Sequence, residues 1–94
     1  MKAALLIVQF IVLNPDALET YKQQVKPILK AHSGSPVTAG KFESLLGNSK
    51  YTHISIFRFP KKESLINWFN SKEYQSLSKI RDEAIDSSFI VIEE

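Results

Sequence analysis

Apolar and polar positions follow two different periods along the chain, and the changes of period divide it into elements. Residues 5–13 form an apolar run, rich in β-branched side chains and too short for a helix, which predicts a buried strand. Helical spacing follows from Leu18 to His32, behind the helix-start signal Asn14-Pro15. Ser33-Gly34 predicts the end of this helix, which Pro27 should kink.

The second half of the chain predicts two more strands, a helix pair and a last strand. Residues 37–46 are extended in pattern, with a bulge or bend predicted at Ala39-Gly40, and a turn follows at 47–49. Residues 51–59 alternate as a strand does. Two helical stripes then span 65–85, separated at Asn70-Ser71 and closed at Asp86-Ser87, before a strand at 89–92.

This order of elements predicts a single α+β domain over residues 1–94, with the split βαβ arrangement of ferredoxin-like folds and a four-stranded antiparallel sheet. Two helices can cover only one face of such a sheet. A chain of 94 residues is also marginal by itself, because small domains bury a modest fraction of their surface. We therefore expect a homodimer that covers the second face.

The predicted strands suggest which residues lie on that second face. Tyr51, His53, Ser55, Phe57 and Phe59 share one side of their strand. This side is aromatic and partly polar, as in a ligand cavity or a dimer interface. We expect this side to point away from the helices, together with residues of the first strand that include Ile7, Gln9, Ile11 and Leu13.

One segment carries a family resemblance. Residues 68–75 read Trp-Phe-Asn-Ser-Lys-Glu-Tyr-Gln, followed by Leu77, Ile80 and Arg81. In residue identity and spacing this segment resembles the signature of the domain-of-unknown-function 1330 family, within the dimeric α+β barrel superfamily. Weaker likenesses are Leu6-Ile7-Val8-Gln9, Asn14-Pro15, Tyr21, Gly40 and Phe59-Pro60.

The resemblance implies a dimer in which two sheets pair face to face, with a pocket in each subunit or at the seam. Relatives of that architecture include cofactor-free monooxygenases and muconolactone isomerase-like enzymes, but the family's reaction is not established. The chain departs from the family's pattern at four positions, because His53, Arg58, Lys61 and Lys72 stand where arginine, glutamate, serine and proline are common. Residues 35–39 also lack arginines often seen there, which indicates an altered ligand.

A few polar and aromatic residues are candidates for a site. His53 is the candidate catalytic residue, because an imidazole titrates near neutral pH and can act as a general base; a packed strand histidine is the alternative. Tyr74 and Arg81 lie seven apart on a helix and can bind a carboxylate or neighbouring backbone. We expect these three residues to converge on one cavity. The candidate ligand-binding residues are Tyr21, Trp68, Tyr74, Arg81 and Gln9, with Trp68 more typical of a core.

Composition and charge limit the partners, cofactors and cellular locations that we expect for this chain. The net charge is +2 without a basic block, and the RNA-recognition pattern is absent from residues 51–57, so we expect no nucleic acid partner. The chain has no cysteine and two isolated histidines, and we expect neither a metal nor a cofactor. Its first apolar run is broken by Gln9, unlike a signal peptide, and no stretch reaches membrane-spanning length, which predicts a cytoplasmic protein without membrane contact.

Two functions remain open from the sequence. The first is a homodimer with a small-molecule pocket, acting as a cofactor-free, monooxygenase- or isomerase-like enzyme on small organic acids or aromatics. The second is a non-catalytic module for ligand binding or dimerisation. A polar pocket lined by Tyr, Arg and His favours the first, and a filled, dry seam favours the second.

Overall fold

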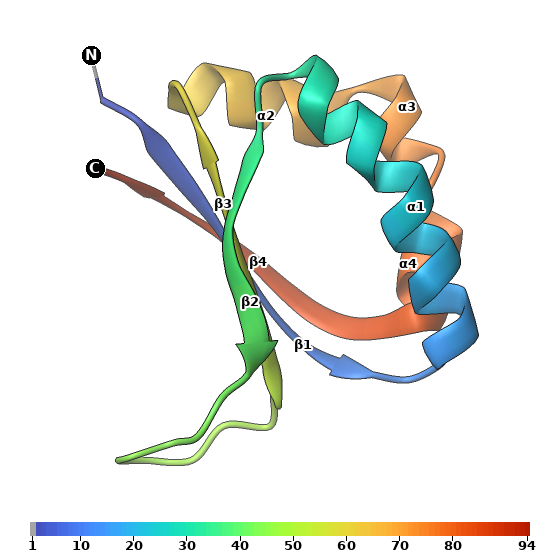
Figure 1. Ribbon diagram of the computed structural model, residues 1–94, viewed down its shortest axis with the longest axis vertical. Coiled ribbons are helices and arrows are strands. Elements are labelled where there is room, and N and C mark those ends of the chain that lie inside the picture. Colours follow the sequence, from blue (N-terminus) through green and yellow to red (C-terminus); the bar gives the residue numbers. More distant parts are fainter. Residues whose placement is uncertain (1) are drawn as a thin grey trace.

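The computed structural model describes residues 2–94, and in them one four-stranded antiparallel sheet carries helices on a single face (Figure 1). The strand order is β2-β3-β1-β4. This is the predicted ferredoxin-like α+β class. The elements are β1 (Ala4–Val12), α1 (Pro15–Ala31), β2 (Ser35–Lys41), β3 (His53–Phe59), α2 (Lys62–Asn70), α3 (Lys72–Gln75), α4 (Ser78–Ala84) and β4 (Ile85–Glu93).

The start of α1 follows from its local sequence. The side chain of Asn14 accepts a hydrogen bond from the Ala17 amide at 3.1 Å, and Pro15 occupies the first helical position, where its missing amide proton costs nothing. The helix continues through the exposed Pro27 to Ala31. One helix therefore runs from Pro15 to Ala31 without a break.

The turn after α1 contains two small residues, Ser33 and Gly34, which have different structural roles. Ser33 has φ +64°, and the amides of Ser33 and Gly34 bond the carbonyls of Lys30 and Leu29 at 3.1 and 2.8 Å, which is a Schellman ending. Glycine usually takes the left-handed position, but here it comes one residue later. A Cβ on Gly34 would lie 2.7 Å from the ring of Phe59, so glycine is required there by contact.

The predicted helix pair is divided once more than the sequence indicated. Ser71 joins α2 to α3, because its hydroxyl donates to the Trp68 carbonyl at 2.7 Å and accepts from the Tyr74 amide at 3.2 Å. The second predicted helix is two helices, α3 and α4. The predicted end at Asp86-Ser87 is also wrong, since β4 already begins at Ile85.

A long-range contact explains the early end of α4. The amides of Leu13 and Asn14 bond the carbonyl of Ala84 at 2.8 and 3.1 Å. These two donors come from the junction of β1 and α1, far away in sequence. The last helical carbonyl is thereby satisfied, and the chain turns directly into β4.

The edge strand β2 also differs in detail from the prediction. Its irregularity lies between Pro36 and Thr38, not at Ala39-Gly40, and an edge strand tolerates a proline. The loop that follows projects away from the sheet (Figure 1). Leu45 and Leu46 in this loop are 99% and 96% exposed.

The register of β1 and β3 corrects the predicted sheet faces. Phe10 pairs with His53, and Gln9 pairs with Ile54. Since Phe10 is buried beneath the helices, His53 lies on the helix-facing side, and only Gln9 points away. Phe57 and Phe59 share the side of His53, so they too were assigned to the wrong face, whereas Ile7 and Ile11 do lie on the outer side.

Candidate functional site

A cavity of about 550 Å³ lies between α1 and the helix-facing side of the sheet. Ligand pockets in proteins typically measure about 300–1,000 Å³. Among residues 2–94, no aspartate, glutamate or histidine lines the cavity, and its surface is mostly apolar. The lining residues are Leu6, Val8 and Phe10 of β1; Leu18, Tyr21, Lys22, Val25, Lys26, Leu29 and Lys30 of α1; Gly34, Ser35, Pro36 and Ala39 around β2; Ser55 and Phe57 of β3; Trp68 of α2; and Ile85 and Phe89 of β4.

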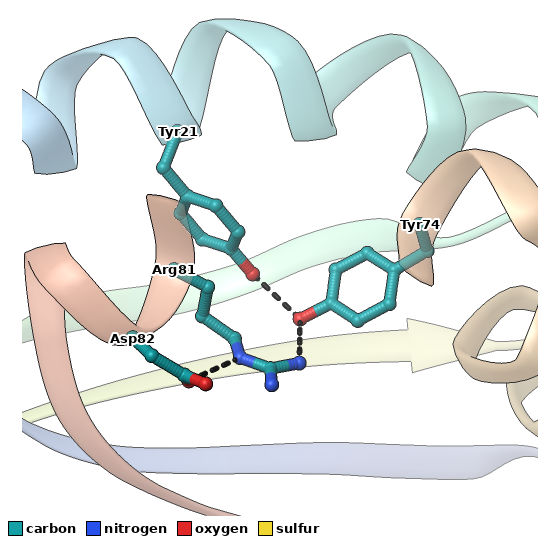
Figure 2. A network of polar contacts seen from close by, with 4 residues as sticks. All are labelled: Tyr21, Tyr74, Arg81 and Asp82. Carbon is teal, nitrogen blue, oxygen red and sulfur yellow. Dashed lines mark hydrogen bonds and ion pairs between the residues drawn. The ribbon is translucent and has the colours of Figure 1, made fainter. Parts of the chain in front are cut away.

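Tyr21 links this lining to a polar network in which the two phenols are buried (Figure 2). Its hydroxyl lies 2.7 Å from the hydroxyl of Tyr74, which receives a long contact of 3.5 Å from Nη1 of Arg81. Nε of Arg81 donates to Asp82 at 3.0 Å. One connected chain of polar atoms therefore joins three helices, with one side chain each from α1 and α3 and two from α4.

The surroundings change the acidity of both phenols. Burial raises the pKa of Tyr21 well above its ordinary value, and the neighbouring Tyr74 raises it further. Burial also raises the pKa of Tyr74, although the hydrogen bonds that it shares with Arg81 and Tyr21 oppose this shift. The pKa of Arg81 is raised because its bonds to Tyr74 and Asp82 outweigh burial, the largest single effect, which lowers it. Both phenols are thus neutral and Arg81 is charged at neutral pH.

Trp68 stands between the network and the cavity. Its ring centroid lies 4.1 Å from that of Tyr74 and 5.8 Å from that of Phe59, and the side chain is 1% exposed. Its indole Nε1 is buried without a hydrogen-bond partner among residues 2–94. Such an unpaired donor typically costs about 1–3 kcal/mol, so packing has to offset it.

The sequence candidates separate into two groups. Tyr21, Trp68, Tyr74 and Arg81 come together, and the first two of these line the cavity. His53 does not line it: its ring stacks on Phe10 at 5.3 Å and its Nδ1 lies 2.7 Å from the Thr52 hydroxyl. Gln9 lies on the opposite face of the sheet. His53, Tyr74 and Arg81 thus do not form one lining.

Lys22, Lys26 and Lys30 are lining residues that the sequence analysis missed. Their signal is the i, i+4, i+8 spacing immediately after the buried positions Tyr21, Val25 and Leu29. Within residues 2–94 no cluster of three metal-binding side chains is present. No helix in that part of the chain is both long and apolar enough to cross a membrane.

Comparison with known proteins assigns the fold and a family. The family model described as "Domain of unknown function (DUF1330)" matches residues 3–94. No curated protein matches the sequence. Among solved structures, a protein of unknown function from Rhodopseudomonas palustris is similar with 21% identity and a TM-score of 0.80, over 97% of this chain and 81% of that one.

Two other solved structures share the architecture at lower identity. SnoaB, a cofactor-independent oxygenase from Streptomyces nogalater, has 9% identity and a TM-score of 0.72, over 98% of this chain and 92% of that chain. A dimeric ferredoxin-like protein of unknown function from Thermobifida fusca has 11% identity and a TM-score of 0.65, over 97% and 90%. At these identities the likeness establishes the fold alone.

Proposed function

This chain belongs to the family described as domain of unknown function 1330, and we propose that it binds a small, largely apolar organic molecule in the cavity between α1 and the sheet. One observation carries this proposal. The apolar lining includes Tyr21, whose hydroxyl ends the hydrogen-bond chain that begins at Arg81. A mostly apolar cavity with a few polar groups is typical of ligand sites.

Counting the protons in the network supports a polar contact with the ligand. Arg81 can only donate, so Tyr74 accepts at that contact. In the head-to-tail arrangement that we propose, Tyr74 donates to Tyr21. The hydroxyl proton of Tyr21 then lacks an acceptor among residues 2–94. A carbonyl or phenol oxygen of the bound molecule would supply that acceptor.

The same network supports a second candidate function, a cofactor-free reaction of the monooxygenase or isomerase kind. A cofactor-independent oxygenase shares the fold. Positive charge at Arg81, transmitted through Tyr74 and Tyr21, would stabilise negative charge developing on a ligand oxygen. His53 would act as a general base only for a ligand that extends past Phe10, since the cavity itself contains neither a carboxylate nor an imidazole. Binding without catalysis is therefore the better supported function.

Homodimerisation through the outer face of the sheet is part of the proposal. A structural neighbour is described as dimeric. Ile90 and Ile92 are each 47% exposed on that face, where a monomer would leave a continuous apolar surface. Gln9 faces this seam, so a ligand role for it is proposed only there. The outer face also carries the aliphatic residues Leu5, Ile7, Ile11, Ile54 and Ile56.

Sedimentation tests the dimer with a matched pair of variants. The parent chain should be dimeric at micromolar concentration, and Ile90→Lys should be monomeric because it buries a charge in the seam. Ile66→Lys, at a position 39% exposed on α2, should remain dimeric. A monomeric parent, or equal behaviour of the two variants, contradicts the proposed interface.

Binding of the neutral fluorescent probe N-phenyl-1-naphthylamine tests the cavity. Ala39→Trp places a large ring at the β2 wall of the cavity and should weaken binding by at least about tenfold, or about 1.4 kcal/mol. Asn67→Trp adds the same ring at an exposed position of α2 and should bind as the parent does. Equal binding by parent, Ala39→Trp and Asn67→Trp would place the probe elsewhere and contradict the proposal.

A further inference from the structure

In the part of the chain that the structure describes, three lysines and no acidic residue border one side of the cavity. Lys22, Lys26 and Lys30 follow one another at four-residue spacing along α1 and all line the cavity. At 1.5 Å per residue they extend over roughly 12 Å of the helix. Strand β2, which also contributes to the lining, contains no aspartate or glutamate.

This row of charges is unfavourable for the protein alone. Like charges four residues apart on a helix destabilise it by roughly 0.2–0.5 kcal/mol per pair, and Lys26 has such a neighbour on each side. Among the residues that the structure describes, none of the three lysines forms a salt bridge, whereas Lys50, Lys61, Arg58 and Arg81 each do. The acidic residues of α1, Asp16 and Glu19, lie near its N-terminus and do not line the cavity.

We infer that the molecule bound in the cavity is an amphiphilic anion, with an apolar body inside and a carboxylate or similar acidic group held by Lys22, Lys26 and Lys30. This inference rests on the proposed binding function and specifies its ligand class. It also assigns the anionic end of the ligand to the row of lysines and its neutral oxygen to Tyr21. Arg81, already engaged with Tyr74 and Asp82, does not hold the anion.

The charge and shape of the site support one kind of occupant. The apolar surface lies in a recess between α1 and the sheet, which suits a ligand whose apolar body enters the cavity. The positive groups stand on long flexible stems at its border, which suits a compact anionic group of variable position. An uncharged apolar molecule would leave the repulsion among the lysines unrelieved.

Two probes with the same aromatic skeleton test the inference. 1-Anilinonaphthalene-8-sulfonate carries an anionic group, and N-phenyl-1-naphthylamine does not. The parent protein should bind the sulfonate at least about tenfold more tightly than the neutral probe. Adding salt should weaken the sulfonate complex more than the neutral one, because the ion pairs lie near solvent.

Two triple variants with equal net charge separate a local effect from a global one. Lys22→Gln/Lys26→Gln/Lys30→Gln should lose the preference for the sulfonate and keep the affinity for the neutral probe. Lys62→Gln/Lys72→Gln/Lys79→Gln changes three exposed lysines on the other helices and should keep both affinities. Decanoate should displace the sulfonate from the parent and the control better than decanol does.

Each outcome has a definite meaning. If neither probe binds the parent, the proposed cavity function fails. If the neutral probe binds but the sulfonate binds no better, the cavity stands and the anion inference is overturned. The inference is equally overturned if both triple variants lose the preference to the same extent, because the effect is then one of net charge alone.

Discussion

The helix-facing side of the sheet consists of a packed half and a hollow half. In the packed half, four of the five largest fully buried side chains, Trp68, Tyr74, Phe59 and Leu65, come from α2, α3 and the end of β3. In the hollow half, α1 and β2 leave a cavity of about 550 Å³. One sheet thus carries a close-packed core and an open site side by side.

The difference follows from the size of the side chains. Large rings from α2 and α3 fill the packed half, where Trp68 contacts both Phe59 and Tyr74. β2 contributes only the small residues Ser35, Pro36 and Ala39 to the lining of the cavity. A domain this small can leave one half hollow only if the other half supplies most of the stability.

Removing the central ring of the packed half should have the largest effect. Trp68→Ala should lower the free energy of unfolding by roughly 3–5 kcal/mol, because it removes a buried indole that contacts three aromatic rings. Urea denaturation measures the change. Trp68→Phe should cost less, since it also removes the unpaired Nε1. A Trp68→Ala variant as stable as the parent would show that the packed half does not support the fold.

Adding atoms should have opposite effects in the two halves. Ala4→Val in the fully buried packed half should cost about 1–3 kcal/mol through overpacking, although valine is a good strand residue. Val25→Leu fills part of the cavity and should raise the free energy of unfolding by about 0.8 kcal/mol while weakening probe binding. Losses of stability in both variants would mean that the cavity is closed in solution.

The network at the border of the halves should give stability a pH dependence. Burial raises the pKa of Tyr21 and Tyr74 in the folded chain above the ordinary value of about 10. Above about pH 10 the unfolded chain therefore binds fewer protons than the folded chain. The free energy of unfolding then falls as the pH rises, by up to about 1.4 kcal/mol per pH unit for each of the two tyrosines. Below that pH the contribution is complete.

Tyr21→Phe should reduce this alkaline slope. Urea denaturation between about pH 8 and pH 11 measures it. Val25→Ala, which removes part of a buried side chain but keeps both phenols, should be less stable than the parent at every pH with the parent's slope. An unchanged slope in Tyr21→Phe would mean that this phenol titrates as it does in the unfolded chain.

Sequence reasoning succeeded where local chemistry decides the structure. The helix starts at Asn14 and Ser71, the order of elements and the core position of Trp68 were predicted correctly, because caps and periodicity act within a few residues. The family signature also identified the residues that assemble around Tyr74. Tyr21, another of the candidate ligand-binding residues, joins them from α1.

The errors arose where distant residues decide. The alternation of side chains in β3 separates its two faces but does not show which face meets the helices. The pairing of His53 with Phe10 decides which face this is. The end of α4 depends on amides from Leu13 and Asn14. The cavity itself could not be predicted, because a void results from how α1 and β2 are placed relative to one another.

The smallest effect that we predict concerns the turn that connects α1 to β2, the two elements that border the hollow half. Ser33 adopts φ +64°, which costs a non-glycine residue about 1–2 kcal/mol, and glycine's greater freedom in the unfolded chain offsets part of the gain. Ser33→Gly should therefore raise the free energy of unfolding by about 0.5–1 kcal/mol. Ser64→Gly, the same change inside α2, should lower it by about 0.5–1 kcal/mol. Urea denaturation of both variants checks the opposite signs, and a loss in both would mean that the turn carries no strain that glycine relieves.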